Sequence, residues 1–411
     1  MLPTTAEGVV VTGLGAVSCL GPDVESLWRG LLEGRSGIGP ITKFDTTGYR
    51  NDRGGEVTDF QFQPADFGIP AEEALDEATQ FVLVASAEAL ADSGLAFPLA
   101  RPERVGLVFS TNFGGAAAWE WFVENPDLGG PGPTTALFRQ FAFHSAADQA
   151  ACSFGLRGPT LTLSNSCSSG TSALGYAADL IRHGRAEVML AGGYDTLSPS
   201  SLSGLSALRT LTAEEIRPFD RNRSGTLFGE GAGVLVLEGR AHAEARGARI
   251  YAELVGYGMN NNAYHLTAPD KGGEGLVQVM RRALADAQVL PEEIDYVNAH
   301  GTGTQYHDAA ETQALKAVLG NHAYRIPVSS IKAATAHPMA AAGTLEAIAS
   351  VLAIRDGMVP PTLHYETPDP ECDLDYVPNV ARPATVHCVL SISSGIGGNN
   401  AAVIFRRVPG R

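Results

Sequence analysis

The chain has 411 residues, of which 44% are hydrophobic and 18% charged, so it can bury one large core or two fused ones and is not disordered. Its net charge of −16 argues against nucleic acid or an anionic membrane as a partner, because both bind cationic surfaces. Residues 1–7 lack the basic stretch and apolar core of a secretory signal, and no uncharged apolar run reaches membrane-spanning length. We therefore expect a cytoplasmic protein with no nucleic-acid partner and no membrane partner.

The five cysteines are odd in number and scattered, and none belongs to a C-x-x-C pair. This distribution signals neither a disulfide framework nor a zinc site. We expect reduced thiols and no bound metal.

A strand followed by a glycine-rich turn occurs twice in the chain. Residues 8–15 have this pattern, and residues 251–258 repeat it, which suggests two related halves. The first turn, from Gly13 to Ser18, lacks the third glycine of a dinucleotide-binding loop, so a Rossmann site is disfavoured. The charged stretch 239–249 is the expected junction, with an N-terminal half at 1–250 and a C-terminal half at 251–411.

Helical and strand patterns alternate along both halves. A helix is predicted at 80–91, and continuous apolar runs predict buried strands at five further places. These are residues 104–110, 186–193, 294–299, 326–331 and 389–393. Continuous apolar strands separated by helices imply α/β layers in which both faces of the sheet are covered.

Cys167 lies between a predicted strand and a predicted helix. Residues 161–166 alternate apolar and polar side chains, and residues 168–184 form a helix that opens with small residues. A thiol at a helix N-terminus feels the positive end of the helix dipole, which lowers its pKa and favours a nucleophilic thiolate. The alternative is a buried, inert cysteine. Two distant histidines favour the nucleophile.

These histidines, His300 and His337, follow predicted strands, the usual place for functional groups in α/β sheets. His300 follows the strand at 294–299 and opens a glycine-containing turn. His337 directly precedes Pro338, which suits the first position of an alanine-rich helix running to Asp356. His265 and His307 lack the strand-end setting, so a structural or merely exposed role is favoured for both.

Lys332 and Glu346 lie fourteen positions apart, and an ion pair between them would hold the lysine inside a buried site. The alternative is a pair that serves stability alone. The C-terminal turn 394–400 has three glycines in four positions, which leaves backbone N–H groups free to point at a ligand. Alone this signal is weak, because many hairpins are rich in glycine.

Together these residues resemble the β-ketoacyl synthases of the thiolase superfamily, in the branch with a Cys-His-His triad. The similarity covers nearly the whole chain, through residues 11–15, 217–225, 229–233 and 395–398. Residues 369–378 and 327–332 look most like the ketosynthase alpha subunit of bacterial type II polyketide synthases. The resemblance implies an α/β thiolase fold, with two pseudo-duplicated halves in α-β-α-β-α layers.

The chemistry implied by the resemblance is a decarboxylative Claisen condensation. Cys167 would take the acyl chain from the phosphopantetheine arm of an acyl carrier protein, and no cofactor would be bound to the enzyme itself. Malonyl carrier protein would follow, and His300 and His337 would donate hydrogen bonds to its thioester oxygen. Lys332 with Glu346 would set the electrostatics around the histidines.

The resemblance also implies contacts around these groups. An oxyanion hole would use the backbone N–H groups of Cys167 and Ile396. Side chains would contact the pantetheine (Thr302, Thr304, Thr267), the acyl chain (Phe113, Leu205) and the carrier protein (Arg209). Ile396 replaces the family's usual phenylalanine gate, and Phe113 and Leu205 alter the expected pocket shape.

The implied partners are acyl carrier protein and either a second copy of the chain or a homologue that resembles a chain length factor. Three other functions remain open. One is a fatty-acid elongation synthase with the same chemistry, and a second is an acyltransferase that acylates an amine or alcohol. The third is a non-catalytic chain-length subunit, which the presence of all three triad residues disfavours.

Overall fold

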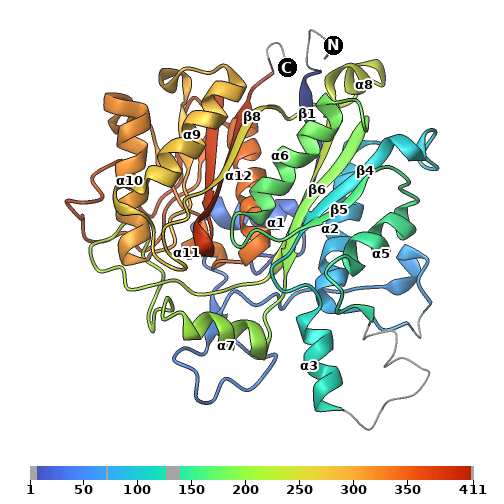
Figure 1. Ribbon diagram of the computed structural model, residues 1–411, viewed down its shortest axis with the longest axis horizontal. Coiled ribbons are helices and arrows are strands. Elements are labelled where there is room, and N and C mark those ends of the chain that lie inside the picture. The colour runs from blue at the N-terminus through green and yellow to red at the C-terminus, as the bar shows by residue number, and fades with distance from the viewer. Residues whose placement is uncertain (1–6, 71–72, 126–138, 409–411) are drawn as a thin grey trace.

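The computed structural model describes residues 7–70, 73–125 and 139–408. Ten strands form one mixed sheet in the order β10-β9-β13-β14-β8-β1-β7-β6-β4-β5 (Figure 1). The strands of the N-terminal half are β1 (Val9–Ser18), β4 (Val105–Ser110), β5 (Thr160–Leu163), β6 (Val188–Asp195) and β7 (Gly231–Gly239). Those of the C-terminal half are β8 (Ala252–Asn261), β9 (Tyr296–Asn298), β10 (Val328–Ser329), β13 (Cys388–Ser394) and β14 (Asn399–Arg406). Two small hairpin-like pairs add β2 (Gly39–Pro40) with β3 (Arg53–Gly54), and β11 (Met358–Val359) with β12 (Arg382–Pro383).

The two halves repeat one topology. From the centre outwards, the N-terminal strands run β1-β7-β6-β4-β5 and the C-terminal strands run β8-β14-β13-β9-β10. The outermost strand of each half, β5 or β10, is the third of that half's five sheet strands in sequence order. In each half the outer pairings are parallel and the inner ones antiparallel. β1 pairs with β8 through Val9–Val11, which joins the halves into one sheet.

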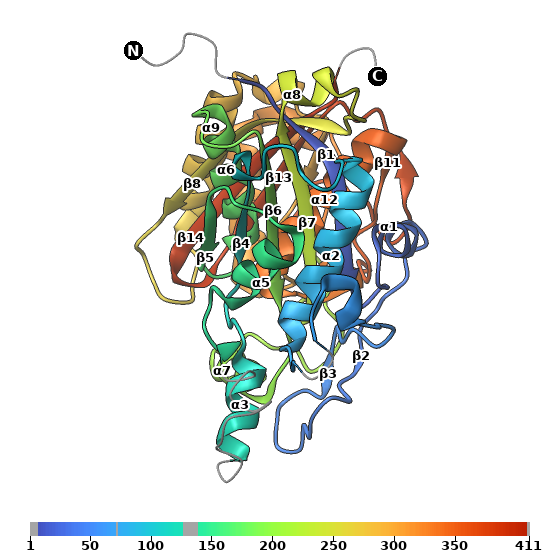
Figure 2. The same ribbon diagram turned by 90° about the vertical axis from the view of Figure 1, so that its right-hand side faces the viewer.

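Helices lie on both faces of each half, giving alternating layers of helix and sheet (Figures 1 and 2). α2 (Glu77–Ser93) and α5 (Ser145–Phe154) cover the N-terminal strands, and α9 (Glu274–Ala287) with α10 (Gln305–Leu319) covers the C-terminal ones. Between the two sets of strands lie α6 (Ser169–Arg182) and α12 (Ala342–Asp356), which contact each other. The expected α-β-α-β-α layering is therefore present.

The other α-helices within the described ranges lie outside these layers. They are α1 (Val24–Leu32), α3 (Ala116–Glu124), α7 (Pro199–Ala207), α8 (Arg240–Ala245) and α11 (Lys332–Thr335). α8 occupies the charged stretch that was expected to join the halves. A boundary at residue 250 stays a prediction.

α6 and α12 owe their central position to their composition. α12 is buried from Ala342 to Ile354, and α6 is buried from Ser169 to Gly175, beyond which Tyr176 is exposed. A helix segment that is buried all round packs between two sheet layers rather than facing water. This places the N-terminal ends of both helices inside the molecule.

The predicted elements are present, but most of their bounds differ by a few residues, and three of the differences lie next to the predicted site residues. β5 ends at Leu163, and β10 comprises only Val328–Ser329. The expectation that the alanine-rich helix starts at Pro338 is wrong: a 3₁₀ turn spans Met339–Ala341, and α12 begins at Ala342. Met339 has a φ of 51°, which interrupts right-handed helical geometry. Within the described part of the chain, no helix combines the length and the apolar character needed to cross a membrane.

Candidate active site

Cys167 lies at a sharp turn between β5 and α6. Ser166 before it has a φ of 58°, and Ser168 after it is the N-cap of the helix. The thiol is 6% exposed and lines an internal pocket. The Ser166 hydroxyl lies 3.8 Å from the Cys167 sulfur, and the backbone N–H of Ile396 donates to the same atom.

Burial raises the pKa of the Cys167 thiol above its ordinary value, although Ser166, the Ile396 N–H and the charge of Lys332 act in the opposite direction. The expectation that the helix N-terminus yields a thiolate is therefore wrong for the free protein. Desolvation outweighs these opposing contributions to the pKa, and the resting group is a thiol.

His300 and His337 face each other in this pocket. Their ring centroids are 5.5 Å apart at an interplanar angle of 86°, and the residues are 4% and 2% exposed. Burial and then the nearby charge of Lys332 hold the pKa of both imidazoles well below the usual value. Both rings are therefore neutral near pH 7.

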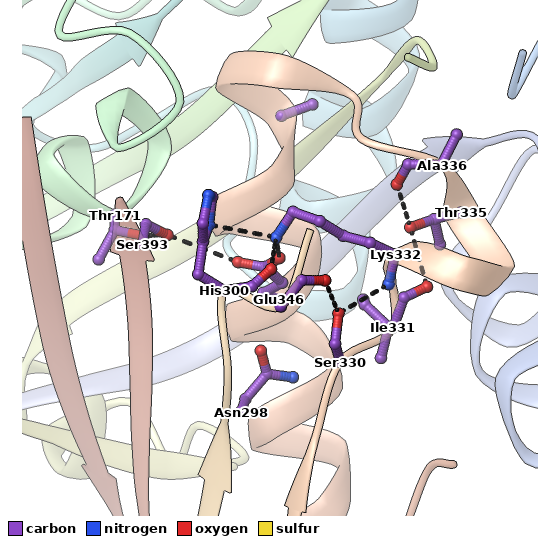
Figure 3. A network of polar contacts seen from close by, with 12 residues as sticks. Thr171, Asn298, His300, Ser330, Ile331, Lys332, Thr335, Ala336, Glu346 and Ser393 are labelled. Atoms are coloured by element: carbon purple, nitrogen blue, oxygen red, sulfur yellow. Dashed lines mark hydrogen bonds and ion pairs between the residues drawn. The ribbon is translucent and has the colours of Figure 1, made fainter. Parts of the chain in front are cut away.

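Lys332 determines which nitrogen of His300 carries the proton. Its Nζ lies 3.3 Å from Nδ1 of His300 and donates to the His300 carbonyl at 2.6 Å, as Figure 3 shows. An ammonium group has no acceptor, so Nδ1 must accept and the proton of the neutral ring is on Nε2. His300 thus presents an N–H donor from Nε2.

Lys332 is held by an ion pair with Glu346, and both side chains are fully buried (Figure 3). Ser393 donates to the other oxygen of Glu346 at 3.5 Å, and its hydroxyl also bonds Thr171 on α6 at 2.8 Å. Burial raises the pKa of Glu346, opposed by Lys332. The predicted ion pair is present and contacts His300 directly.

His337 is held through its backbone rather than its ring. Its N–H donates to Leu227, and its ring packs against Phe228 with centroids 5.7 Å apart. Neither ring nitrogen has a hydrogen-bond partner among the described residues. Both nitrogens are therefore free for a ligand.

The C-terminal turn packs directly onto the Cys167 turn. A Cβ added to Gly395 would lie 3.0 Å from the Ser166 Cβ and 3.1 Å from the Cys167 nitrogen. Gly395 therefore allows the close approach that brings the Ile396 N–H to the sulfur. Ile396 itself is half-buried and lines the pocket.

Threonine hydroxyls line the same pocket. Thr267, Thr302 and Thr304 are all present in its wall, and the hydroxyls of Thr302 and Thr304 are 2.9 Å apart. His307 also reaches the wall, with Nε2 3.3 Å from the Thr267 carbonyl, which sequence reasoning disfavoured. His265 is exposed and accepts backbone N–H groups of its own loop.

The three other expected contact residues lie outside this wall. Phe113 and Leu205 belong to an adjoining apolar cluster that includes Phe228 and Met339 and against which Ile396 packs. Arg209 follows α7, has a φ of 57° and is exposed. The cluster thus adjoins the pocket behind Phe228 and Ile396.

Sequence reasoning missed several residues. Thr210, Thr226, Phe228 and Ser394 also line the pocket. Isolated threonines carry no periodic signal.

Glu311 accepts the N–H groups of His300 and Gly301 at 2.7 and 2.9 Å, and burial raises its pKa to about 7. Glu311 lies on a helix eleven positions after His300, and this spacing alone does not show that the two residues are in contact.

Asp195 was also missed. It ends β6, is fully buried, and accepts hydrogen bonds from Thr111, Asn112, Phe113 and Ala340. Burial raises its pKa to about 6. An acidic residue at a strand end was a usable signal. Over the described ranges, no group of three or more His, Cys, Asp or Glu side chains is placed to hold a metal ion.

Comparison with known proteins covers nearly the whole chain. Residues 6–243 match the model of the β-ketoacyl synthase N-terminal domain, and residues 251–366 match that of the C-terminal domain. The "3-oxoacyl-[acyl-carrier-protein] synthase 2" of Coxiella burnetii is 40% identical, with 97% of this chain and 98% of the relative covered. The "Putative polyketide beta-ketoacyl synthase 1" of Streptomyces cyaneus is 42% identical, with 98% and 99% covered.

Two solved structures are similar over 98% of this chain and all of theirs. One is described as a type II PKS acyl-carrier protein in complex with its ketosynthase bound to the hexaketide, with a TM-score of 0.90 and 34% identity. The other is the ishigamide ketosynthase/chain length factor, with a TM-score of 0.89 and 36% identity. The fold is accordingly the thiolase fold of ketosynthases. Matches of this extent establish that the chain belongs to the β-ketoacyl synthase family, whose members are acyltransferases that form carbon–carbon bonds.

Proposed function

We propose that this β-ketoacyl-[acyl carrier protein] synthase performs decarboxylative Claisen condensation in type II polyketide biosynthesis. The observation that carries the proposal is that one buried pocket is lined by Cys167, His300 and His337. The sulfur supplies a nucleophile, and the two neutral imidazoles supply hydrogen-bond donors for an oxyanion.

Acyl transfer comes first. The Cys167 sulfur attacks the thioester carbonyl of an acyl carrier protein, the bond to the pantetheine sulfur breaks, and the thiol proton leaves with the pantetheine thiol. The N–H groups of Cys167 and Ile396 bind the oxyanion of this step, and such donors are each worth roughly 10²–10³ in rate. The raised pKa of Cys167 means that its proton is lost as the acyl group arrives.

Decarboxylation of the malonyl thioester follows. His300 and His337 donate to the thioester oxygen, the bond to the carboxylate breaks, and its electron pair remains on the carbon as an enolate while carbon dioxide leaves. Because the charge moves onto the oxygen held by the histidines, those bonds strengthen as the reaction proceeds. The enolate attacks the acyl-cysteine, the C–S bond breaks and the thiol is regenerated after protonation. Lys332, held by Glu346, keeps the proton of His300 on the nitrogen that faces the substrate.

Substrate contacts are assigned in the same proposal. Thr302, Thr304 and Thr267 bind the pantetheine arm of the substrate, and Arg209 contacts the carrier protein. The apolar cluster with Phe113 and Leu205, behind Ile396, receives the acyl chain. Acyl carrier protein is supported as a partner by the ketosynthase complex described above.

The assembly is proposed from the neighbours. The ishigamide structure is described as a ketosynthase/chain length factor, which supports a heterodimer with a homologue of that kind here, and a homodimer is the alternative. A division into halves at 1–250 and 251–411, and a cytoplasmic location, belong to the same proposal.

A fatty-acid elongation synthase is the second candidate, favoured by the 40% identity to the Coxiella burnetii 3-oxoacyl synthase. The two functions differ in product. The purified chain should be supplied with malonyl carrier protein, with and without a co-expressed homologue of the chain-length-factor type, and the carrier-bound products should be measured by mass spectrometry. The polyketide function predicts unreduced chains extended more than once when the homologue is present. A single extension of saturated medium-length acyl carriers, with no effect of the homologue, would assign the chain to fatty-acid elongation, and acylation of an amine without carbon dioxide release would overturn both.

A further inference from the structure

Within the part of the chain that the structure describes, two threonine hydroxyls in the active-site pocket have no hydrogen-bond partner. Thr226 is 3% exposed, and its Oγ1 has no hydrogen bond among the described residues; the same holds for the buried Oγ1 of Thr210. Both residues line the pocket that contains His337. A buried hydroxyl without a partner is costly to the fold, so its presence in a substrate pocket indicates a hydrogen bond to a ligand.

The two threonines lie beside each other on paired backbone. The Thr226 N–H donates to the Thr210 carbonyl at 2.9 Å, and Thr226 forms a parallel bridge with Leu211. Gly225 donates to Gly303 at 3.0 Å, which sets the pair against the turn of Thr302 and Thr304. The threonine pair is therefore close to the proposed pantetheine contacts.

The same segment leads to His337 on its other side. Phe228, two residues after Thr226, bridges to His337 and packs against its ring. Thr226 thus lies between the Thr302–Thr304 turn and the imidazole of His337. Phe228 also belongs to the apolar cluster of Phe113 and Leu205, so that cluster adjoins the pocket on this side.

We propose that the hydroxyls of Thr226 and Thr210 bind the carboxylate of the malonyl group, which leaves as carbon dioxide. This inference rests on the proposed decarboxylative condensation. Apart from the thioester carbonyl, which the histidines bind, the carboxylate is the remaining strong acceptor of a malonyl group, and two hydroxyls match its two oxygens.

The neutrality of these donors suits the reaction. The described residues that line the pocket include no Lys, Arg, Asp or Glu. A cation at the carboxylate would stabilise the substrate more than the transition state, in which negative charge moves away to the thioester oxygen, and would slow the step. Hydroxyls orient the carboxylate without that penalty.

The test separates extender binding from acyl loading. Thr226→Val keeps the shape of the side chain and removes only its hydroxyl, and Thr226→Ser returns a hydroxyl. Enzyme preloaded with an acyl group at Cys167 is given malonyl carrier protein, and carbon dioxide release is measured against carrier concentration. We expect Thr226→Val to lower kcat/KM by about 10- to 100-fold, mainly through KM, as for a lost hydrogen bond to a charged group.

Two controls accompany this measurement. The first is acyl transfer to Cys167, whose rate should change less than about twofold in Thr226→Val. The second is the variant Thr162→Val. Thr162 also has a buried, unpartnered hydroxyl but does not line the pocket. Both valine variants should unfold at or above the wild-type temperature, because each removes an unsatisfied polar group. Recovery in Thr226→Ser supports the inference. Unchanged kcat/KM in Thr226→Val, or an equal fall in acyl transfer, overturns it, whereas a wild-type protein that releases no carbon dioxide overturns the proposed function itself.

Discussion

At the scale of single residues, burial controls the chemistry of this site more than any local sequence feature. Cys167 stands at the start of a helix, yet desolvation raises its pKa above the ordinary value. The histidines are shifted in the other direction by the same cause and stay neutral. The site therefore rests with a protonated sulfur and two uncharged rings.

The sulfur should show this state in its reactivity. Below its pKa the thiolate fraction rises about tenfold per pH unit, so alkylation of Cys167 by iodoacetamide should increase steadily from pH 7 to pH 9 without a plateau. Peptide mass spectrometry would follow the site, with a free cysteine peptide as the reference. A rate that levels off below pH 8 would show a stabilised thiolate and contradict this account.

Variants of the Lys332–Glu346 pair should distinguish its effect on the stability of the fold from its effect on catalysis. Glu346→Gln leaves a buried ammonium without its counter-ion, so we expect a loss of about 3–5 kcal/mol in the free energy of unfolding. The double variant Lys332→Met with Glu346→Gln has no unpaired charge and should recover most of that loss. It should nevertheless remain slow in carbon dioxide release, because His300 Nδ1 has lost its donor. A double variant that regains both stability and activity would assign the pair to stability alone.

At the scale of elements, the site is assembled from turns at matching strand ends of the two halves. Cys167 follows β5, and His337 follows the short helix α11 that comes after β10, the strand at the equivalent place in the other half. His300 follows β9, and Ile396 joins β13 to β14. The repeated topology brings these turns to one end of the central helices.

The contact between two of these turns depends on Gly395. In Gly395→Ala the new Cβ would crowd Ser166 and Cys167 at about 3 Å, so the turns must separate. We expect slower acyl transfer to Cys167 and about 1–3 kcal/mol lower stability, as for an overpacked core. Gly204→Ala in α7 is the matched control, because nothing lies within 4 Å of its added Cβ. Acyl transfer at the wild-type rate in Gly395→Ala would show that the spacing of these turns does not matter.

Sequence patterns predicted the elements well where local composition decides them, as in the helix-forming residues of α2 and the continuous apolar runs of β4 and β6. They placed Cys167 and His300 correctly in the turns that follow β5 and β9, but His337 lies beyond the short helix α11 rather than at the end of β10. The predictions failed where long-range contacts decide the backbone conformation. Met339 has a positive φ, so α12 begins later than predicted, and a methionine in the sequence does not indicate a positive φ. The pKa of Cys167 and the orphaned hydroxyls of Thr226 and Thr210 depend on burial by distant segments, and no local pattern records that.

At the scale of the whole molecule, three side chains spread over residues 167–337 meet because two similar halves share one core. α6 from the first half and α12 from the second pack side by side between the sheet layers. Their N-terminal ends lie near the nucleophile and near His337, respectively. Both halves therefore contribute residues to the one active-site pocket.

The most direct test measures acyl loading and carbon dioxide release separately in Cys167→Ala, His300→Ala and His337→Ala. Intact-mass analysis after incubation with acyl carrier protein reports the first, and carbon dioxide release from malonyl carrier protein in the presence of an acyl donor reports the second. We expect Cys167→Ala to carry no acyl group, and both histidine variants to load acyl groups nearly normally yet to release little carbon dioxide and form no condensed product. An acyl adduct retained in Cys167→Ala, or histidine variants that lose loading while decarboxylation persists, would contradict the account.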